Sequence, residues 1–311
     1  MLAVFAAGIY FYEYDKNNPS EATVIIPKGS FKNAVDTLAE NEIIRYPSLA
    51  KILVAVDGNA KKIKAGEYLF PANVSMQEAI KILVSGKVVE HRLTIPEGLT
   101  IRQIKEILSS EDKLVGDFPE NIAEGSLAPD TYFFTMGDSR SAMIARMQEK
   151  MQNIVEKLWE NRTENLPLKN KEEAMVLASI VEKETGVADE RARVAAVFIN
   201  RLRIGMRLQS DPTTIYGIEQ KLGKKMEGEL SLTDLKTPTP YNTYTIPALP
   251  PTPICNFGKE ALEAVLHPAP TNDLYFVATG TGGHRFSSTL EEHNRNVALY
   301  RRAMQTINNR K

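Results

Sequence analysis

Apolar and polar residues recur along this chain with two periods, one typical of helices and one typical of strands. The clearest helical pattern spans Lys171–Gly186, where Ala174, Leu177, Ile180 and Val181 form one apolar stripe. Further amphipathic helices are predicted at residues 31–40, 79–84, 101–108, 143–159, 190–203 and 289–304. Strands are predicted at residues 23–26, 63–70, 92–95, 127–134, 273–279 and 283–287. Helices mixed with short strands in this way predict an α+β fold.

The amino-terminal third repeats one local pattern. Thr23–Gly29 and Arg92–Gly98 are both strand-like runs that end in Pro-x-Gly and lead into an amphipathic helix. Capping boxes predict helix starts at Ser75 and Thr100, because each is followed three residues later by Glu or Gln. Residues 20–88, with the order β-α-α-β, resemble a LysM module, which binds N-acetylglucosamine-containing glycans. The alternative is a spacer without ligand, and both interpretations stay open.

The amino terminus is apolar from Met1 to Tyr12 and ends in an aromatic cluster before Glu13. A membrane span needs ~20 apolar residues, so this run alone is too short. It also lacks the preceding basic residues and the small-residue cleavage site of a signal peptide. We interpret residues 1–14 as the remnant of a longer transmembrane helix whose aromatic residues lie at the membrane interface. A buried core strand is the alternative.

Composition excludes several kinds of site. The chain has 311 residues, enough for two moderate domains, and its formal net charge of −1 does not favour nucleic acid as a partner. The single cysteine, Cys255, excludes an internal disulfide and a cysteine-based zinc site. The four histidines, His91, His267, His284 and His293, are too widely spaced to form a ligand pair on one helix face. We therefore expect no metal and no cofactor.

The apolar stripe of the central helix contains an acid. Relative to Leu177, Glu184 falls roughly 20° away and Glu182 roughly 140° away on the helical wheel. Burial disfavours a charged carboxylate, so the pKa of Glu184 should be raised and the residue is a candidate general acid. Glu182 is predicted to be an ordinary solvated carboxylate. The alternative for Glu184 is a structural ion pair with a buried arginine.

The other candidate groups have structural interpretations. Asp130 follows a proline in a turn, where an aspartate usually accepts a backbone hydrogen bond. Asp211 precedes Pro212, which is typical of a helix N-cap. His284 opens the second strand of a predicted hairpin and His293 lies in the first turn of the closing helix. We predict packing or hydrogen-bonding roles for both histidines.

Several motifs together resemble one family. They are Ala178–Thr185, Val197–Leu202, Gly205–Thr213, Tyr241–Tyr244, Leu249–Pro251, Leu274–Val277, Gly283–Phe286 and His293–Asn294. In this order they resemble the MltG-type (YceG-like) endolytic murein transglycosylases over nearly the whole chain. The resemblance implies an inner-membrane anchor, a LysM-like subdomain and a catalytic domain, residues 89–311, on the periplasmic or outer face. The catalytic glutamate of the family maps, through Glu-x-Glu-Thr, onto Glu184.

The resemblance also implies a reaction, a lyase-type cleavage of MurNAc-β-1,4-GlcNAc bonds within peptidoglycan strands. Glu184 donates a proton to the glycosidic oxygen and then accepts the proton of the C6 hydroxyl, which closes a 1,6-anhydro ring. Such cleavage would terminate nascent strands, with glycan strands and peptidoglycan synthases as expected partners. Two rivals are a lysozyme-like hydrolase that uses Asp211 or Asp130 as second carboxylate, and a non-catalytic wall-binding protein.

Four residues are candidates for holding the sugar: Gln209, Ser210, Asn242 and Tyr244. Gln209 and Ser210 precede the predicted cap on extended backbone, and amide and aromatic side chains suit sugar recognition. The chain departs from the family pattern at Ala248, Thr252 and Phe257, where the family has two glycines and a proline. Because Ala and Thr resist positive φ, we expect this loop to be shaped differently.

Overall fold

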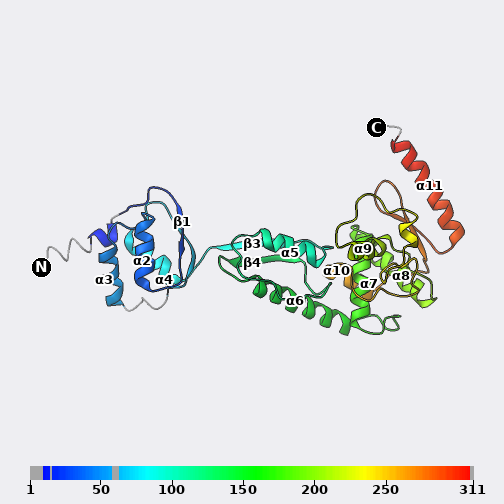
Figure 1. The fold of residues 1–311 in the computed structure, drawn as a ribbon, viewed down its shortest axis with the longest axis horizontal. Helices are drawn as coiled ribbons and strands as arrows, with labels where there is room; N and C mark the ends of the chain where they lie inside the picture. Colours follow the sequence, from blue (N-terminus) through cyan, green and yellow to red (C-terminus); the bar gives the residue numbers. More distant parts are fainter. Residues whose placement is uncertain (1–9, 15, 58–62, 309–311) are drawn as a thin grey trace. The chain divides into compact units, whose positions relative to one another are not determined.

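The chain separates into two compact units in the computed structural model, which describes residues 10–14, 16–57 and 63–308 (Figure 1). The first unit comprises the described residues up to Leu93 together with residues 111–116 and 132–140. The second comprises residues 94–110 and 117–131 and the described chain from Ser141 onward. Helices are mixed with two-stranded sheets, so the α+β class is confirmed.

The first unit is a small antiparallel sheet with helices. Its main elements are β1 (Ala22–Ile26), α2 (Phe31–Glu40), α3 (Pro47–Asp57), β2 (Gly66–Phe70) and α4 (Met76–Ser85). β1 pairs with β2 in register from Ala22 opposite Phe70 to Ile26 opposite Gly66. The order β-α-α-β therefore matches the sequence pattern, and alternate strand residues such as Val24, Ile26 and Tyr68 are buried against the helices.

Both predicted capping boxes are present. The Ser75 hydroxyl accepts the N–H of Glu78 at 3.2 Å, and the Glu78 carboxylate accepts the N–H of Ser75 at 2.9 Å. The Thr100 hydroxyl and the Gln103 side chain form the same reciprocal pair at the start of α5 (Ile101–Ser110). Each box satisfies two backbone donors that have no partner within the helix, so these starts are set locally.

The second unit carries most of the helices. They are α5, α6 (Arg140–Glu160), α7 (Lys171–Glu184), α8 (Arg191–Arg203), α9 (Asp211–Leu222), α10 (Lys259–Leu266) and α11 (Leu290–Asn308), with short 3-10 turns at Ala188–Glu190 and Asp234–Lys236. Its strands β5 (Tyr275–Ala278) and β6 (His284–Ser287) form the predicted antiparallel hairpin. A further two-stranded sheet pairs β3 (Glu90–Ile95) with β4 (Asp130–Thr135), and most residues of these two strands belong to the first unit.

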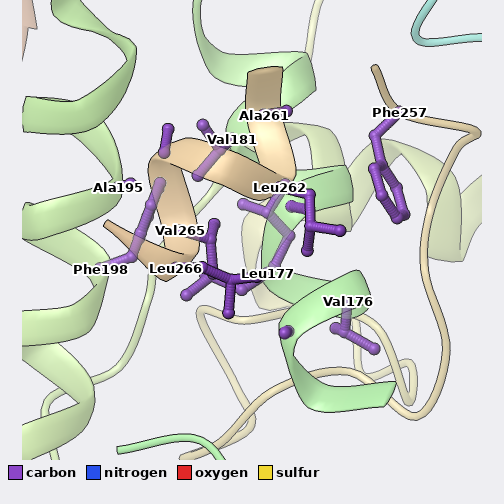
Figure 2. Packing of buried hydrophobic residues seen from close by; sticks show 14 of the residues in the cluster. Val176, Leu177, Val181, Ala195, Phe198, Phe257, Ala261, Leu262, Val265 and Leu266 are labelled. Atoms are coloured by element: carbon purple, nitrogen blue, oxygen red, sulfur yellow. The ribbon is translucent and has the colours of Figure 1, made fainter. Parts of the chain in front are cut away.

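The core of the second unit lies where α7, α8 and α10 meet. Figure 2 shows Leu177 of α7 and Leu262 of α10 side by side, and both are fully buried. Val181 from α7 and Phe198 from α8 belong to the same cluster. Phe257, one of the departures from the family pattern, is also fully buried in this core. Packing against two helices fixes α7, and with it the residue at its carboxy-terminal end.

The predicted transmembrane remnant, residues 1–14, lies largely outside the described residues. Of this segment the structure describes residues 10–14 as helix. Within the described part of the chain, no helix combines the length and the apolar composition that crossing a membrane requires.

Candidate active site

One cavity of about 390 Å³ opens at the end of the central helix α7. Its lining residues come from α7, α8, α9, the β5–β6 hairpin, α11 and the loops between them. They are Glu184, Phe198, Arg201, Leu208, Gln209, Asp211, Tyr244, Tyr275, Phe276, Leu290 and His293. Acidic, basic, amide and aromatic side chains line this cavity, which suits a polar ligand with an apolar face, such as a sugar.

Glu184 is the last residue of α7 and lines this cavity. Helix α7 begins at the N-cap Asn170, whose side chain accepts the N–H of Glu173, and ends where Thr185 becomes extended. Burial, together with the charge of Asp211, raises the pKa of Glu184 from 4.5 to about 7. The Ser210 hydrogen bond and the charge of Arg201 act in the opposite direction. The carboxyl is thus protonated in a substantial fraction of molecules at neutral pH.

Ser210 holds one oxygen of Glu184. Its hydroxyl donates to Glu184 Oε1 at 2.5 Å, and the serine is 1% exposed. A protonated carboxyl carries its proton on one oxygen only, so this bond leaves Oε2 as the proton donor. Ser210 is also the N-cap of α9, yet its side chain makes no cap hydrogen bond, because its hydroxyl is engaged by Glu184. The predicted N-cap at Asp211 is therefore wrong by one residue.

A buried cluster of hydroxyls fixes Ser210. The Ser210 N–H donates to Thr243 Oγ1 at 2.9 Å, and Thr213 Oγ1 donates to the Ser210 carbonyl at 2.7 Å. The two threonine hydroxyls lie 2.8 Å apart, and both residues are fully buried. Every polar group of the cluster has a partner, so Ser210 is held with little freedom to rotate.

Arg201 is a buried cation beside Glu184, and sequence reasoning missed it. It is 7% exposed, and its guanidinium donates to the carbonyls of Leu274 at 2.7 Å and Leu208 at 2.5 Å. The side chain lines the cavity and lies over the ring of Tyr275, 5.4 Å from its centroid. Helical spacing contained the signal, because Arg201 follows the buried Val194 by seven residues and so shares its face.

Asp211 and Tyr244 form a second pair at the cavity. The Tyr244 hydroxyl donates to Asp211 Oδ1 at 2.5 Å, and both residues line the cavity. Burial and this hydrogen bond raise the pKa of the Tyr244 phenol, so it stays a neutral donor. Asp211 therefore lines the same cavity as Glu184 with one of its oxygens already engaged.

The structure brings Gln209 to the cavity but not Asn242. Gln209 lines the cavity with φ of 49°, in the left-handed region, so the predicted extended backbone at this residue is wrong. Asn242 is 0% exposed, and its amide donates to the carbonyls of Leu235 and Thr237. Its side-chain oxygen accepts from the loop backbone and from a threonine of α9. All its polar groups are used inside the protein, so Asn242 shapes the loop that carries Tyr244.

The other acids of the sequence have different positions. Asp130 accepts the N–H of Thr131 at 2.6 Å, as predicted for an aspartate in a turn, and pairs with Lys150. Glu182 is half-buried and accepts the N–H of Gly258 at 2.9 Å. The prediction that it is an ordinary solvated carboxylate is therefore wrong, because it joins α7 to the loop before α10. Neither acid lines the cavity.

The two carboxy-terminal histidines differ from one another. His284 donates from its backbone to Glu190 at 2.9 Å, and its Nδ1 lies 2.7 Å from the same carboxylate. The hydrogen-bonded role predicted for His284 is therefore confirmed. His293 lies in the first turn of α11, as predicted, but its ring lines the cavity.

A second carboxyl with a raised pKa lies outside this cavity. Burial raises the pKa of Glu124 to about 7, and the carboxylate accepts hydrogen bonds from the Ile101 N–H and from Asn256 and Tyr216. It joins the start of α5 to the loop around Asn256. A raised pKa alone would have marked Glu124 as catalytic, and its position shows a structural role.

A model of the YceG-like family matches residues 24–299. The chain is 29% identical to an endolytic murein transglycosylase of Bacillus subtilis (strain 168), over 92% of this chain and 86% of that protein. It is 28% identical to one of Streptococcus pneumoniae serotype 2 (strain D39 / NCTC 7466), over 96% of this chain and 63% of that protein. A crystal structure of a yceG-like protein from Listeria monocytogenes matches with a TM-score of 0.54 and 30% identity, over 89% of this chain and 99% of that one.

Proposed function

Because the chain belongs to the YceG-like family, we propose that it cleaves peptidoglycan strands internally as an endolytic murein transglycosylase. The relatives from Bacillus subtilis and Streptococcus pneumoniae carry that name. The observation that carries the proposal for this chain is Glu184, a carboxyl with a pKa of about 7 at the wall of a sugar-sized cavity. A non-catalytic wall-binding protein has no need of such a group.

In the proposed reaction, Glu184 acts first as acid and then as base. The Oε2 proton passes to the glycosidic oxygen as the bond to the MurNAc C1 breaks, and the GlcNAc leaves as an alcohol. The resulting carboxylate takes the proton of the C6 hydroxyl of the same MurNAc, whose oxygen bonds to C1. Atoms and charge balance without water, and Glu184 ends protonated. Arg201 stabilises the transient carboxylate, and Ser210 keeps its hydrogen bond to Oε1 throughout.

Gln209 and Tyr244 are the proposed sugar contacts. Both line the cavity, and the Gln209 amide offers a donor and an acceptor to hydroxyl and N-acetyl groups. The positive φ of Gln209 costs free energy in a non-glycine residue, of order 1 kcal/mol, and such conformations cluster at functional sites. Ser210 has a different role here, since its hydroxyl is engaged by Glu184.

One observation favours a second function, a lysozyme-like hydrolase. Asp211 lies at the same cavity as Glu184 and raises its pKa, so a second carboxylate is available to assist water. The Tyr244 hydroxyl occupies one Asp211 oxygen, which weakens Asp211 as a base. Asp130 does not line the cavity and offers no support to this alternative.

The pH dependence of cleavage tests the acid role. Cleavage needs protonated Glu184, so the rate at which soluble fragments are released from purified glycan strands should fall as the pH rises through about 7. Ser210→Ala removes a hydrogen bond that lowers this pKa, so the falling limb should move to higher pH. We expect a rate loss of about tenfold, from less ordered positioning of Oε2. A Ser210→Ala profile that coincides with that of the parent would contradict this role.

Ser231→Ala is the matched control for Ser210→Ala. Ser231 also donates to a carboxylate, Asp234 Oδ2 at 2.6 Å, but it is exposed and does not line the cavity. Its removal should leave the pH profile of cleavage unchanged.

The first unit supports a LysM-like interpretation through its element order. β1, α2, α3 and β2 follow the β-α-α-β sequence, with β1 and β2 paired antiparallel. Glycan binding and a spacer role remain alternatives for this unit. Titration of an N-acetylglucosamine oligomer into isotope-labelled full chain separates them, because only binding shifts resonances of residues 20–88.

We propose attachment to the cytoplasmic membrane through the amino terminus, with the second unit on the outer face. The support is the apolar, aromatic-terminated run Met1–Tyr12 and the location of peptidoglycan outside that membrane. The full-length gene product should sediment with membranes and be cleaved by protease only from outside the cytoplasm. Recovery in the cytoplasmic fraction would contradict the attachment. That peptidoglycan synthases are partners of the chain at this membrane stays a prediction.

A further inference from the structure

His293 lies at the cavity with an imidazole that the mechanism above does not use. It belongs to the first turn of α11, one turn after Leu290, and both residues line the cavity with Glu184. The i,i+3 spacing places these two side chains on one face of the helix. α11 therefore contributes to the site through its amino-terminal end.

The ring of His293 is held in place. It stacks on Tyr275 with the centroids 5.1 Å apart and an interplanar angle of 23°. Tyr275 lies in turn over Arg201, whose guanidinium is fixed by two backbone carbonyls. Tyr275 therefore contacts both His293 and Arg201, and each of the three side chains lines the cavity. A stacked, partly buried ring of this kind presents its nitrogens in fixed directions.

The protonation state of His293 follows from its surroundings. Burial lowers the pKa of the imidazole, and the positive charge of Arg201 lowers it further, so the ring is neutral at neutral pH. Its Nδ1 is buried without a hydrogen-bond partner in the described part of the chain. A proton on Nδ1 would make it a buried N–H donor with no acceptor, which is rarer in folded proteins than an unpaired acceptor, so we place the proton on Nε2.

We propose that His293 is a substrate-binding residue whose Nε2–H donates a hydrogen bond to a carbonyl oxygen of the glycan, in its acetamido or lactyl amide groups. Within the described residues, Nε2 has no hydrogen-bond partner in the protein, and unlike Nδ1 it is not a buried unpaired atom. Arg201 is a second N–H donor that lines the cavity, so the cavity suits oxygen acceptors. This inference rests on the proposed function, which supplies the glycan.

Kinetics give the first test, with purified glycan strands as substrate. His293→Phe keeps a ring to stack on Tyr275 and removes the donor. We expect KM to rise about three- to tenfold, the effect of one neutral hydrogen bond, with kcat and its pH profile unchanged. His293→Gln restores a donor and should recover part of the loss. His267→Phe is the control, because His267 is exposed and does not line the cavity.

Binding gives a second test that does not need turnover. In ¹⁵N-histidine-labelled full chain carrying Glu184→Gln, the His293 ring should show the neutral Nε2–H tautomer. Its Nε2–H resonance should shift when a GlcNAc–MurNAc oligosaccharide is added, whereas the His267 resonances stay in place.

The two tests separate this inference from the proposed function. The inference is overturned if the KM of His293→Phe equals that of the parent, or if the Nε2–H resonance does not shift on binding. In either case, cleavage by the parent chain still upholds the proposed function. A parent chain that neither cleaves nor binds glycan overturns both.

Discussion

Replacing Glu184 with glutamine should abolish cleavage of glycan strands while the chain still folds and binds them. The amide has the shape of the protonated carboxyl and can still accept the Ser210 hydroxyl, which donates at 2.5 Å in the parent. It cannot transfer a proton, and a positioned general acid contributes about 10²- to 10⁴-fold to a rate. Because Glu184 serves as acid and base in turn, we expect the cleavage rate to fall by about 10⁴-fold or more. The measurement is release of soluble fragments from purified peptidoglycan.

Glu182→Gln is the matched control, because Glu182 lies two residues before Glu184 on α7. Its carboxylate accepts the Gly258 N–H and does not line the cavity, so cleavage should persist. An inactive Glu182→Gln beside an active Glu184→Gln would show that the acid has been assigned to the wrong residue.

The Glu184→Gln substitution should also change the stability of the fold, by an amount that depends on pH. The folded pKa of Glu184 is about 7 against an ordinary 4.5, so the folded state favours the protonated form. The parent therefore loses stability as the pH rises from 4.5 through about 7, whereas glutamine stays neutral. In thermal unfolding, the Tm of Glu184→Gln relative to that of the parent should therefore rise as the pH increases from 4.5 to about 7. The parent is less stable than the variant at high pH because its active site keeps an ionisable acid buried.

Local patterns in the sequence predicted the parts of the fold that local interactions determine. Helical spacing identified α7 and placed Glu184 on its apolar face, because burial of the stripe is what holds that helix. The capping boxes at Ser75 and Thr100 are present, since each bond spans three residues. The hairpin of β5 and β6 follows from turn glycines between apolar runs.

Long-range contacts determine the parts of the site that sequence reasoning missed. The N-cap of α9 is Ser210, not Asp211, and the Ser210 hydroxyl makes no cap bond because Glu184 on another helix engages it. Asn242 looked like a sugar contact, but its amide satisfies backbone groups within its own loop. His293 carries no local signal, and only the hairpin brings Tyr275 against it.

The second large effect concerns the products. Attack by the C6 hydroxyl of the same MurNAc is intramolecular, and a well-oriented internal nucleophile has an effective concentration of about 10⁵ M or more, far above that of water. The alternative requires Asp211 to direct a water, and the Tyr244 hydroxyl already occupies one of its oxygens. We therefore expect nearly all new ends to be 1,6-anhydroMurNAc, each lighter by one water than a hydrolytic end. Mass spectrometry of the digest separates the two.

Digestion of purified peptidoglycan in ¹⁸O-labelled water tests the central claim most directly, because label at the cleaved anomeric carbon can come only from solvent. Glu184→Gln, with the same substrate and water, gives the background for strand ends already present. We expect the new ends in the parent digest to be unlabelled and of anhydro mass. New ends that carry ¹⁸O at C1 would contradict that claim and would assign Glu184 and Asp211 to hydrolysis.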